Sequence, residues 1–276
     1  MLRDITIGQH LPGNSVVHRL DPRLKIILSG VYIVMLFINP NPFGLIISIL
    51  FLSVLYLLAK IPGRMIWRSL KPLLPILVFT SFLNLFFYPG KVLVRVWIFQ
   101  ISDVGLYYAV VMVVRMVCLI SGVGLLTYTT SPIVLTDAIE RLLSPLAKFG
   151  FPAHELAMMM TIALRFIPTL VEETDKIMSA QKARGAELDS GSIAHRIKAL
   201  IPVLIPLFLS AFRRAEELAM AMECRCYRGG EGRTRLRQLH IGGLDIAGVV
   251  VCTVVFVLMG FSGWGFHLIF PAMAMV

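Results

Sequence analysis

VGLYYAVVMVVRMVCLISGVGLLTYT, residues 104–129, is the stretch of this sequence that decides its fold. Arg115 is its only charged residue. A helix needs about 20 consecutive, mostly apolar residues to cross the hydrocarbon core of a bilayer. The stretch is long enough to cross as a single helix, which indicates an integral membrane protein.

The composition of the whole chain agrees with this interpretation. Of the 276 residues, 57% are hydrophobic and 15% are charged, and the mean hydropathy is +0.82. A soluble domain is typically about 45–50% apolar and about 25% charged. The net charge of +10 could point to nucleic acid. The basic residues cluster beside apolar spans, however, which is typical of cytoplasmic loops, so we expect the bilayer and no nucleic acid as a partner.

Four other apolar stretches indicate further spans, at residues 24–38, 43–58, 72–88 and 246–266. The first two are joined by the uncharged turn at residues 39–42, and each is slightly short for a span. Either flanking residues complete them, or they form a hairpin where the membrane is thin. Residues 90–103 form a connector of mixed character. We predict an all-α, polytopic membrane protein with about five transmembrane helices.

The segment 131–240 differs from the rest because it carries most of the charges, mixed with apolar residues at helical spacing. We predict helices here at about 133–149, 153–186 and 192–228, the last two each about 50 Å long. Pro168, Pro202 and Pro206 should bend them. The uncharged stretch 200–212 is too short to span, so we expect it to pack against neighbouring helices or to lie at the membrane interface. The predicted domains are four N-terminal spans (1–130), a cytoplasmic helical module (131–240) and a C-terminal span (241–276).

The distribution of basic residues predicts the orientation in the membrane. Basic residues precede the first span, separate the second from the third, and precede the last: Arg19, Arg23, Lys25; Lys60, Arg64, Arg68, Lys71; Arg233, Arg235, Arg237. The N-terminus and the helical module should therefore be cytoplasmic, with the C-terminus outside. We expect no secretory signal peptide, because polar residues leave no early apolar region.

Two short motifs at the predicted ends of the long helices are candidate binding elements: Ala183-Arg184-Gly185 and Cys224-Arg225-Cys226. Each places an arginine between small residues, which allow the backbone of a partner to approach. A guanidinium offers five donors in a rigid fork that suits carboxylates or carbonyls in a groove. The alternative is that each arginine only complements the negative end of its helix dipole.

Arg115 is the third candidate, because a charge at mid-membrane depth is costly and usually faces protein or water. It is either an anchor or contact for another membrane subunit, or it snorkels from a tilted helix. Neither a phosphate-binding glycine loop nor a catalytic triad nor a zinc-peptidase motif is present. The four cysteines show no disulfide or zinc spacing. We expect no catalytic residues, no cofactor and no metal, with His10 and His18 as the one pair worth testing for a metal.

At these motifs the sequence resembles a known family, the transmembrane T component (EcfT) of energy-coupling factor transporters, which is related to the Q subunit of cobalt transporters. The resemblance covers nearly the whole chain and is carried by residues 7–9, 12–15, 18–25, 129–132, 164–168 and 180–185. The last of these is the most specific. The second arginine motif usually has small residues around the arginine, and here cysteines occupy those places.

The resemblance implies a non-enzymatic coupling subunit of an ATP-driven importer for vitamins or other micronutrients. In that family two long helices cross in the cytoplasm, and their arginine-bearing ends dock onto two ATP-binding cassette ATPase subunits. The membrane part and helix faces hold a substrate-binding S component. Residues 12–15 resemble the version shared by several S components more than the dedicated cobalt or nickel version.

Two other functions remain as alternatives. A self-sufficient secondary transporter would need inverted repeats and polar residues at the membrane midplane, and apart from Arg115 the spans offer Asn84 and hydroxyl groups. A membrane enzyme would need a cluster of carboxylates at the interface, and the sequence indicates none. The sequence does not identify the transported substrate.

Overall fold

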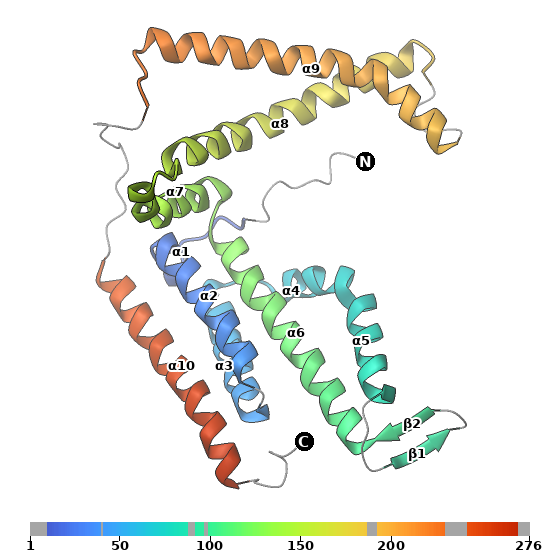
Figure 1. Ribbon diagram of the computed structural model, residues 1–276, viewed down its shortest axis with the longest axis vertical. Coiled ribbons are helices and arrows are strands. Elements are labelled where there is room, and N and C mark those ends of the chain that lie inside the picture. Colours follow the sequence, from blue (N-terminus) through green and yellow to red (C-terminus); the bar gives the residue numbers. More distant parts are fainter. Residues whose placement is uncertain are drawn as a thin grey trace. The chain divides into compact units, whose positions relative to one another are not determined.

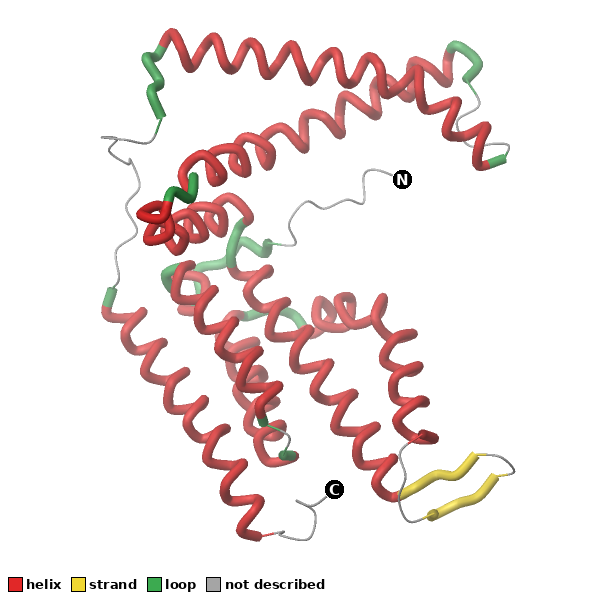
Figure 2. Tube along the Cα trace, viewed as in Figure 1, coloured by secondary structure: helices red, strands yellow, loops and turns green. Residues whose placement is uncertain are grey.

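The computed structural model describes residues 10–39, 41–87, 92–96, 99–186, 192–229 and 242–269. These fall into two compact units. The membrane unit contains the described residues between Gly8 and Ser131 together with those after Gln238, and the helical unit contains those between Pro132 and Arg237. Both units are built almost entirely from helices (Figures 1 and 2).

The membrane unit is a bundle of helices of unequal length. Its helices are α1 (Val16–Arg19), α2 (Pro22–Ile38), α3 (Pro42–Ala59), α4 (Gly63–Leu70), α5 (Leu74–Phe87), α6 (Asp103–Thr129) and α10 (Gly243–Ile269), with a short 3₁₀ helix η2 (Lys71–Leu73) between α4 and α5. At 1.5 Å per residue α6 and α10 are each about 40 Å long, whereas α2 and α3 are about 26 Å long. The α2–α3 hairpin therefore ends well short of the far ends of α6 and α10, as Figure 1 shows.

Local capping residues set where these helices begin. The Ser15 hydroxyl accepts a hydrogen bond from the His18 N–H, and the Asp21 carboxylate accepts one from the Arg23 N–H. Proline follows Asp21 as the first residue of α2, a position where its missing N–H costs nothing. Ser102 caps α6 in the same way through the Gly105 N–H. Such caps satisfy the free N–H groups of a first helical turn.

The core of the membrane unit lies where α2, α3, α6 and α10 meet. The side chains of Tyr32, Leu36, Leu52, Cys118, Phe256 and Met259 are buried there. The Tyr32 hydroxyl is 2.6 Å from the Ser48 hydroxyl, so the buried polar group is satisfied. A Cβ atom at Gly122 would lie 2.6 Å from the Tyr32 ring, which explains the glycine: it lets α6 approach α2 closely.

A two-stranded antiparallel hairpin, β1 (Val92–Val96) and β2 (Phe99–Ser102), occupies most of the expected mixed connector. It is drawn in yellow in Figure 2. The all-α class is confirmed, with this hairpin as the one departure among the described residues. Alternating β-branched residues at 92, 94 and 96 favour a strand over a helix at this position.

Five helical segments are long and apolar enough to cross a membrane: 42–59, 63–86, 103–129, 153–183 and 243–262. Four of them overlap predicted spans. α2 is absent from this set because it has only 17 residues. The additional segment, 153–183, is apolar in its first half but carries Glu172, Glu173, Asp175 and Lys176 in its second.

The helical unit contains α7 (Pro132–Leu143), a 3₁₀ helix η3 (Ser144–Phe149), α8 (Ala153–Ala183) and α9 (Ile193–Cys224). The predicted first helix is thus an α-helix that tightens into 3₁₀ geometry at Ser144. Pro168, Pro202 and Pro206 all lie inside helices that continue past them. Figure 1 shows α8 and α9 crossing each other. Buried small residues, Ala138, Ala153 and Ala157, pack α7 closely against the start of α8.

Candidate functional site

The two arginine motifs end α8 and α9 in the same backbone turn. At the end of α8, the Gly185 N–H donates to the Lys182 carbonyl and the Ala186 N–H donates to the Gln181 carbonyl, both at 3.0 Å. At the end of α9, the Cys226 N–H donates to the Glu223 carbonyl at 2.8 Å and the Tyr227 N–H donates to the Met222 carbonyl at 3.0 Å. This is the Schellman pattern of helix ends. Arg184 and Arg225 hold equivalent places in it.

The residue after each arginine has a left-handed backbone. Gly185 has φ +85° and Cys226 has φ +56°. Glycine adopts this conformation without penalty, whereas a residue with a Cβ atom pays about 1–2 kcal/mol. The second motif therefore keeps the turn of the first at some cost in stability.

The guanidinium groups of both arginines are accessible for binding. Arg184 and Arg225 are exposed. Within the described part of the chain, neither guanidinium has a hydrogen-bond or ion-pair partner that would neutralise it. An exposed guanidinium on a rigid helix end can accept a carboxylate or carbonyl group from another protein.

Contacts between α8 and α9 hold the Arg184 end in place. Pro206 has no N–H, so the carbonyl of Pro202, four residues earlier, lacks its helical partner. The Gln181 amide donates to this carbonyl at 3.4 Å. Further along the crossing, Glu173 accepts hydrogen bonds from Ser210 at 2.5 Å and from Arg214 at 2.9 Å.

A different set of contacts holds the Arg225 end. The Tyr227 hydroxyl is 3.3 Å from His154 Nε2, and His154 Nδ1 is 2.9 Å from a Glu140 carboxylate oxygen. His154 is the second residue of α8, so this contact brings the end of α9 to the beginning of α8. Arg184 lies at the opposite end of α8, about 45 Å away along the helix. The two arginines therefore lie far apart within the helical unit.

Arg115 is an internal anchor rather than a snorkelling residue. Its Nη2 atom donates to the Asn39 carbonyl at 3.1 Å, at the C-terminal end of α2. This carbonyl end carries partial negative charge, which a guanidinium complements. Arg115 lies twelve residues after Asp103, so the α2–α3 turn is about 18 Å below that end of α6. Non-helical backbone at membrane depth must be enclosed by protein or water, and Arg115 supplies part of that enclosure.

Asn39 completes the enclosure of the turn. Its side-chain amide donates to the Met259 carbonyl and, at 3.1 Å, to the Ser262 hydroxyl of α10. Its side-chain oxygen accepts the Asn41 N–H at 3.2 Å. A Cβ atom at Gly44 would collide with this amide, so the glycine leaves it the necessary room. The short hairpin is thus tied to both α6 and α10.

Lys25 connects helices at the other end of the membrane unit, away from the Asn39 turn. The Lys25 ammonium donates to the carbonyls of His18 at 3.1 Å and Thr129 at 3.2 Å, and to the Thr130 hydroxyl at 3.3 Å. The first two groups are free carbonyls at helix C-termini, which need partners. Nearby, the Asp245 carboxylate accepts the Asp21 N–H at 2.7 Å and ties α10 to the start of α2. Thr129 and Thr130 directly precede the helical unit in the chain.

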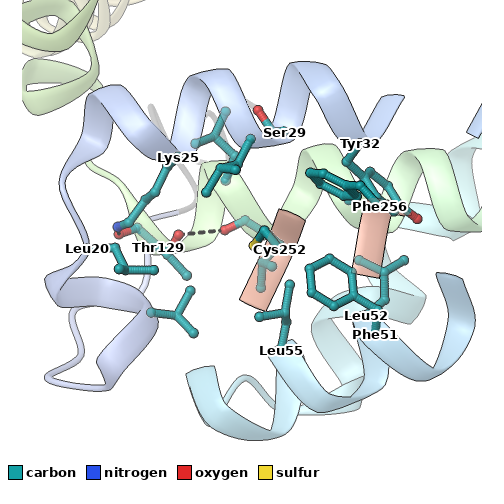
Figure 3. Close-up of a pocket in the computed structure, with 15 residues that line it drawn as sticks. Leu20, Lys25, Ser29, Tyr32, Phe51, Leu52, Leu55, Thr129, Cys252 and Phe256 are labelled. Atoms are coloured by element: carbon teal, nitrogen blue, oxygen red, sulfur yellow. Dashed lines mark hydrogen bonds between the residues drawn. The ribbon is translucent and has the colours of Figure 1, made fainter. Parts of the chain in front are cut away.

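An apolar cavity of about 90 Å³ lies beside Lys25. Figure 3 shows Lys25 and Thr129 at one end of it and Tyr32, Phe51 and Phe256 at the other. Most of its lining side chains are apolar, and Lys25, Ser29 and Thr129 are among the few polar ones.

Comparisons with known proteins agree with these features. The family described as "Cobalt transport protein" matches residues 13–236. The energy-coupling factor transporter transmembrane protein EcfT of Thermosediminibacter oceani is 53% identical over 90% of this chain and 94% of its own length. The EcfT of Acidaminococcus fermentans is 52% identical, covering 96% and 99%, and that of Bacillus subtilis is 44% identical, covering 95% and 99%.

The chain belongs to the EcfT family. It is a multi-pass membrane protein and the transmembrane component of an energy-coupling factor transporter. Membership agrees with the resemblance carried by the sequence motifs. In this EcfT member, Arg184 and Arg225 follow the last turns of α8 and α9. Lys25 and Asn39 connect the helices of the membrane unit at its two ends.

The apolar stretch at residues 200–212 of this EcfT member is largely exposed within the chain. Residues 200–212 were expected to pack against neighbouring helices or to lie at the membrane interface. Val203 is buried, but the larger side chains Ile205, Phe208, Leu209 and Phe212 are each more than 60% exposed within this chain. α9 crosses α8 at a single place, so most of its surface meets no other helix among the described residues.

Sequence reasoning missed several residues of the site in this EcfT member. Tyr227, His154 and Glu140 lie far apart in the sequence and carry no recognisable spacing. Asn39 was noted only as part of an uncharged turn, although two asparagines at a short hairpin are a signal of buried polar contacts. Lys25 was counted as a charge that orients the chain, and its burial shows that it also bonds within the protein.

Proposed function

We propose that this chain is the coupling subunit that links two ATP-binding cassette ATPases to a substrate-binding S component. The observation that carries the proposal is the matched pair of exposed arginines, Arg184 at the end of α8 and Arg225 at the end of α9, which lie in the same backbone turn. Two equivalent docking ends suit two copies of one kind of partner. ATP hydrolysis then belongs to those partners, because this sequence has no phosphate-binding loop.

The exposed apolar face of α9 supports the second half of the proposal. Exposed apolar patches of this kind mark sites of protein or membrane contact. A membrane-embedded S component would supply an apolar surface to cover it. In this arrangement α8 and α9 carry motion between the ATPases and the membrane, as continuous helices about 46–48 Å long.

The test is co-expression with candidate ATPases and S components, followed by purification in mild detergent. We expect the ATPases to co-purify with the wild-type chain, and the Arg184→Glu, Arg225→Glu double variant to lose them. Reversing both charges replaces two attractive contacts by repulsive ones. Arg213→Glu is the matched control, because Arg213 is an exposed arginine in the middle of α9 and should leave the complex intact. ATPases that remain bound to the double variant would contradict the proposal, as would ATP turnover by the purified chain alone.

We also propose that the helical unit is cytoplasmic, and thiol labelling tests this orientation. Asn41 is buried, so the turn at 39–42 is a poor site for a label. Lys71 and Asp103 are exposed and lie at opposite ends of α5. In a background without native cysteines, an impermeant reagent should label Asp103→Cys in intact cells and should label Lys71→Cys only after lysis. The reverse result would invert the topology.

The alternative is a permease subunit dedicated to cobalt or nickel, and the description of the matching family favours considering it. A dedicated subunit would co-purify with one substrate-binding partner, whereas a shared subunit would co-purify with several. Identification of the co-purifying membrane proteins therefore decides between the two.

A further inference from the structure

The C-terminal turns of α8 and α9, which carry Arg184 and Arg225, make different contacts with the rest of the helical unit. At the Arg184 end, the Gln181 amide donates to the Pro202 carbonyl, a contact within the α8–α9 pair. The end at Arg225 is bonded to α7, because Tyr227, two residues later, contacts His154, and His154 contacts Glu140. α7 begins at Pro132, and Ser131 and the cap residue Thr130 are all that separate it from α6.

The three side chains form one consistent chain of donors and acceptors. With the tautomer that carries its hydrogen on Nδ1, His154 donates a hydrogen bond to the Glu140 carboxylate and accepts one at Nε2 from the Tyr227 hydroxyl. Glu140 is only 9% exposed, and the helices around it pack through buried Ala138 and Ala153. A partly buried polar network of this kind restricts its members to one arrangement.

We propose that Tyr227, His154 and Glu140 are positioning residues that connect the Arg225 end to α7 and so pass ATPase motion to the membrane helix α6. This inference rests on the proposed coupling function and adds the path by which motion at Arg225 reaches α6. Force applied at Arg225 crosses the Tyr227–His154 contact, reaches Glu140, and then travels about 12 Å along α7 to Pro132. Force applied at Arg184 acts on the α8–α9 pair through the Gln181–Pro202 contact.

The local turn explains why Tyr227 is in reach of His154. The left-handed backbone of Cys226 reverses the chain after the last turn of α9. The Tyr227 N–H is then held by the Met222 carbonyl. The motif that presents Arg225 thus also sets the position of Tyr227, and the docking residue moves together with the contact to α7.

The experiment measures how far nucleotide moves α7 relative to the membrane unit in the assembled complex. Spin labels are placed at Asp137→Cys on α7 and Lys71→Cys on η2, both exposed positions. The native cysteines are replaced, with glycine at Cys226 to suit its positive φ. Distances are compared without nucleotide and with AMP-PNP, a non-hydrolysable ATP analogue. With the Tyr227–His154–Glu140 contacts intact, we expect the distance between the labels to change by about 2 Å or more, the scale of helix displacements in such transitions.

Tyr227→Phe removes one hydroxyl and His154→Ala removes the ring, and either should reduce the nucleotide-dependent shift. The double variant should do no more than His154→Ala alone, because both changes break one network. His154→Gln keeps a donor and an acceptor and should restore much of the shift. Glu155→Gln, at an exposed neighbour, is the control. Unfolding temperature is measured alongside, since a purely structural role would lower it without altering the shift.

The outcomes separate this inference from the proposed function. If the distance change were equal in wild type, Tyr227→Phe and His154→Ala, the proposed role of the Tyr227–His154–Glu140 contacts would be refuted, while the coupling function would remain in place. No shift in the wild-type complex would also refute that role. Failure of the ATPases to co-purify with the wild-type chain would instead refute the proposed function itself.

Discussion

Lys25→Met tests the idea that one buried ammonium holds together the end of α1, the start of α2 and the end of α6. The substitution keeps the length and the apolar stem of the side chain but removes the charge and its three bonds, at 3.1–3.3 Å, to His18, Thr129 and Thr130. Each hydrogen bond to a charged group is worth about 1.5–3 kcal/mol. The three share one donor group, so their sum overstates the loss, and we expect about 3–5 kcal/mol, as for breaking a buried charged contact.

A loss of this size raises the ratio of unfolded to folded protein roughly 100-fold or more. The measurement is reversible unfolding of the purified chain in detergent, followed by circular dichroism. Lys71→Met is the control, because Lys71 is exposed and its loss should change stability by less than about 0.5 kcal/mol. Thr130→Val removes one acceptor and should cost about 1 kcal/mol. A Lys25→Met chain as stable as the control would refute the assignment of Lys25 as the link between α1, α2 and α6.

Three further predictions follow from single residues. Cys226→Gly should stabilise the chain by about 0.5–1 kcal/mol, because it relieves the left-handed strain and gives back part of that gain as backbone entropy; thermal unfolding of the variant measures it, and a lower midpoint would contradict the strain. Gly44→Ala should cost about 1–3 kcal/mol by displacing the Asn39 amide from its acceptors on α10, whereas Gly30→Ala, with no described atom within 4 Å of its new Cβ, should be neutral or stabilising in the same melts. Burial lowers the pKa of His18 below its usual value of 6.5, so the folded state binds fewer protons than the unfolded state. The contribution of His18 to stability should therefore decline as the pH falls below about 6.5. A His18→Gln chain should lack this part of the pH dependence, and identical acid-unfolding profiles of the two chains would contradict the prediction.

Much of the architecture was predictable from sequence because it depends on local patterns. Four of the predicted spans agree with helices long enough to cross a bilayer, since a run of apolar residues decides this without any tertiary contact. The two arginine motifs were expected at helix ends, and both are there. Small residues beside the arginines gave the signal, and the left-handed turns at Gly185 and Cys226 show its structural basis.

The β1–β2 hairpin and the exposure of α9 were not predictable in this way. The hairpin occupies a segment in which apolar and polar residues alternate too briefly to separate a strand from a loop. The apolar stretch of α9 has the composition of a buried helix, but burial depends on what packs against it. Within the described chain α8 contacts one side of α9, at Pro202, Ser210 and Arg214, and leaves the large apolar side chains of Phe208, Leu209 and Phe212 exposed.

The sequence by itself determined the class of the protein, most of its spans and the two arginine motifs at helix ends, because hydropathy and helix ends are encoded by residues within a few turns of one another. Only the tertiary structure decided what the buried polar residues do. Arg115 meets Asn39 across 76 residues, Lys25 meets Thr129 across 104, and Tyr227 meets His154 across 73. Each of these contacts joins residues of different helices or helix ends, so it depends on how the chain packs and has no local signature in the sequence.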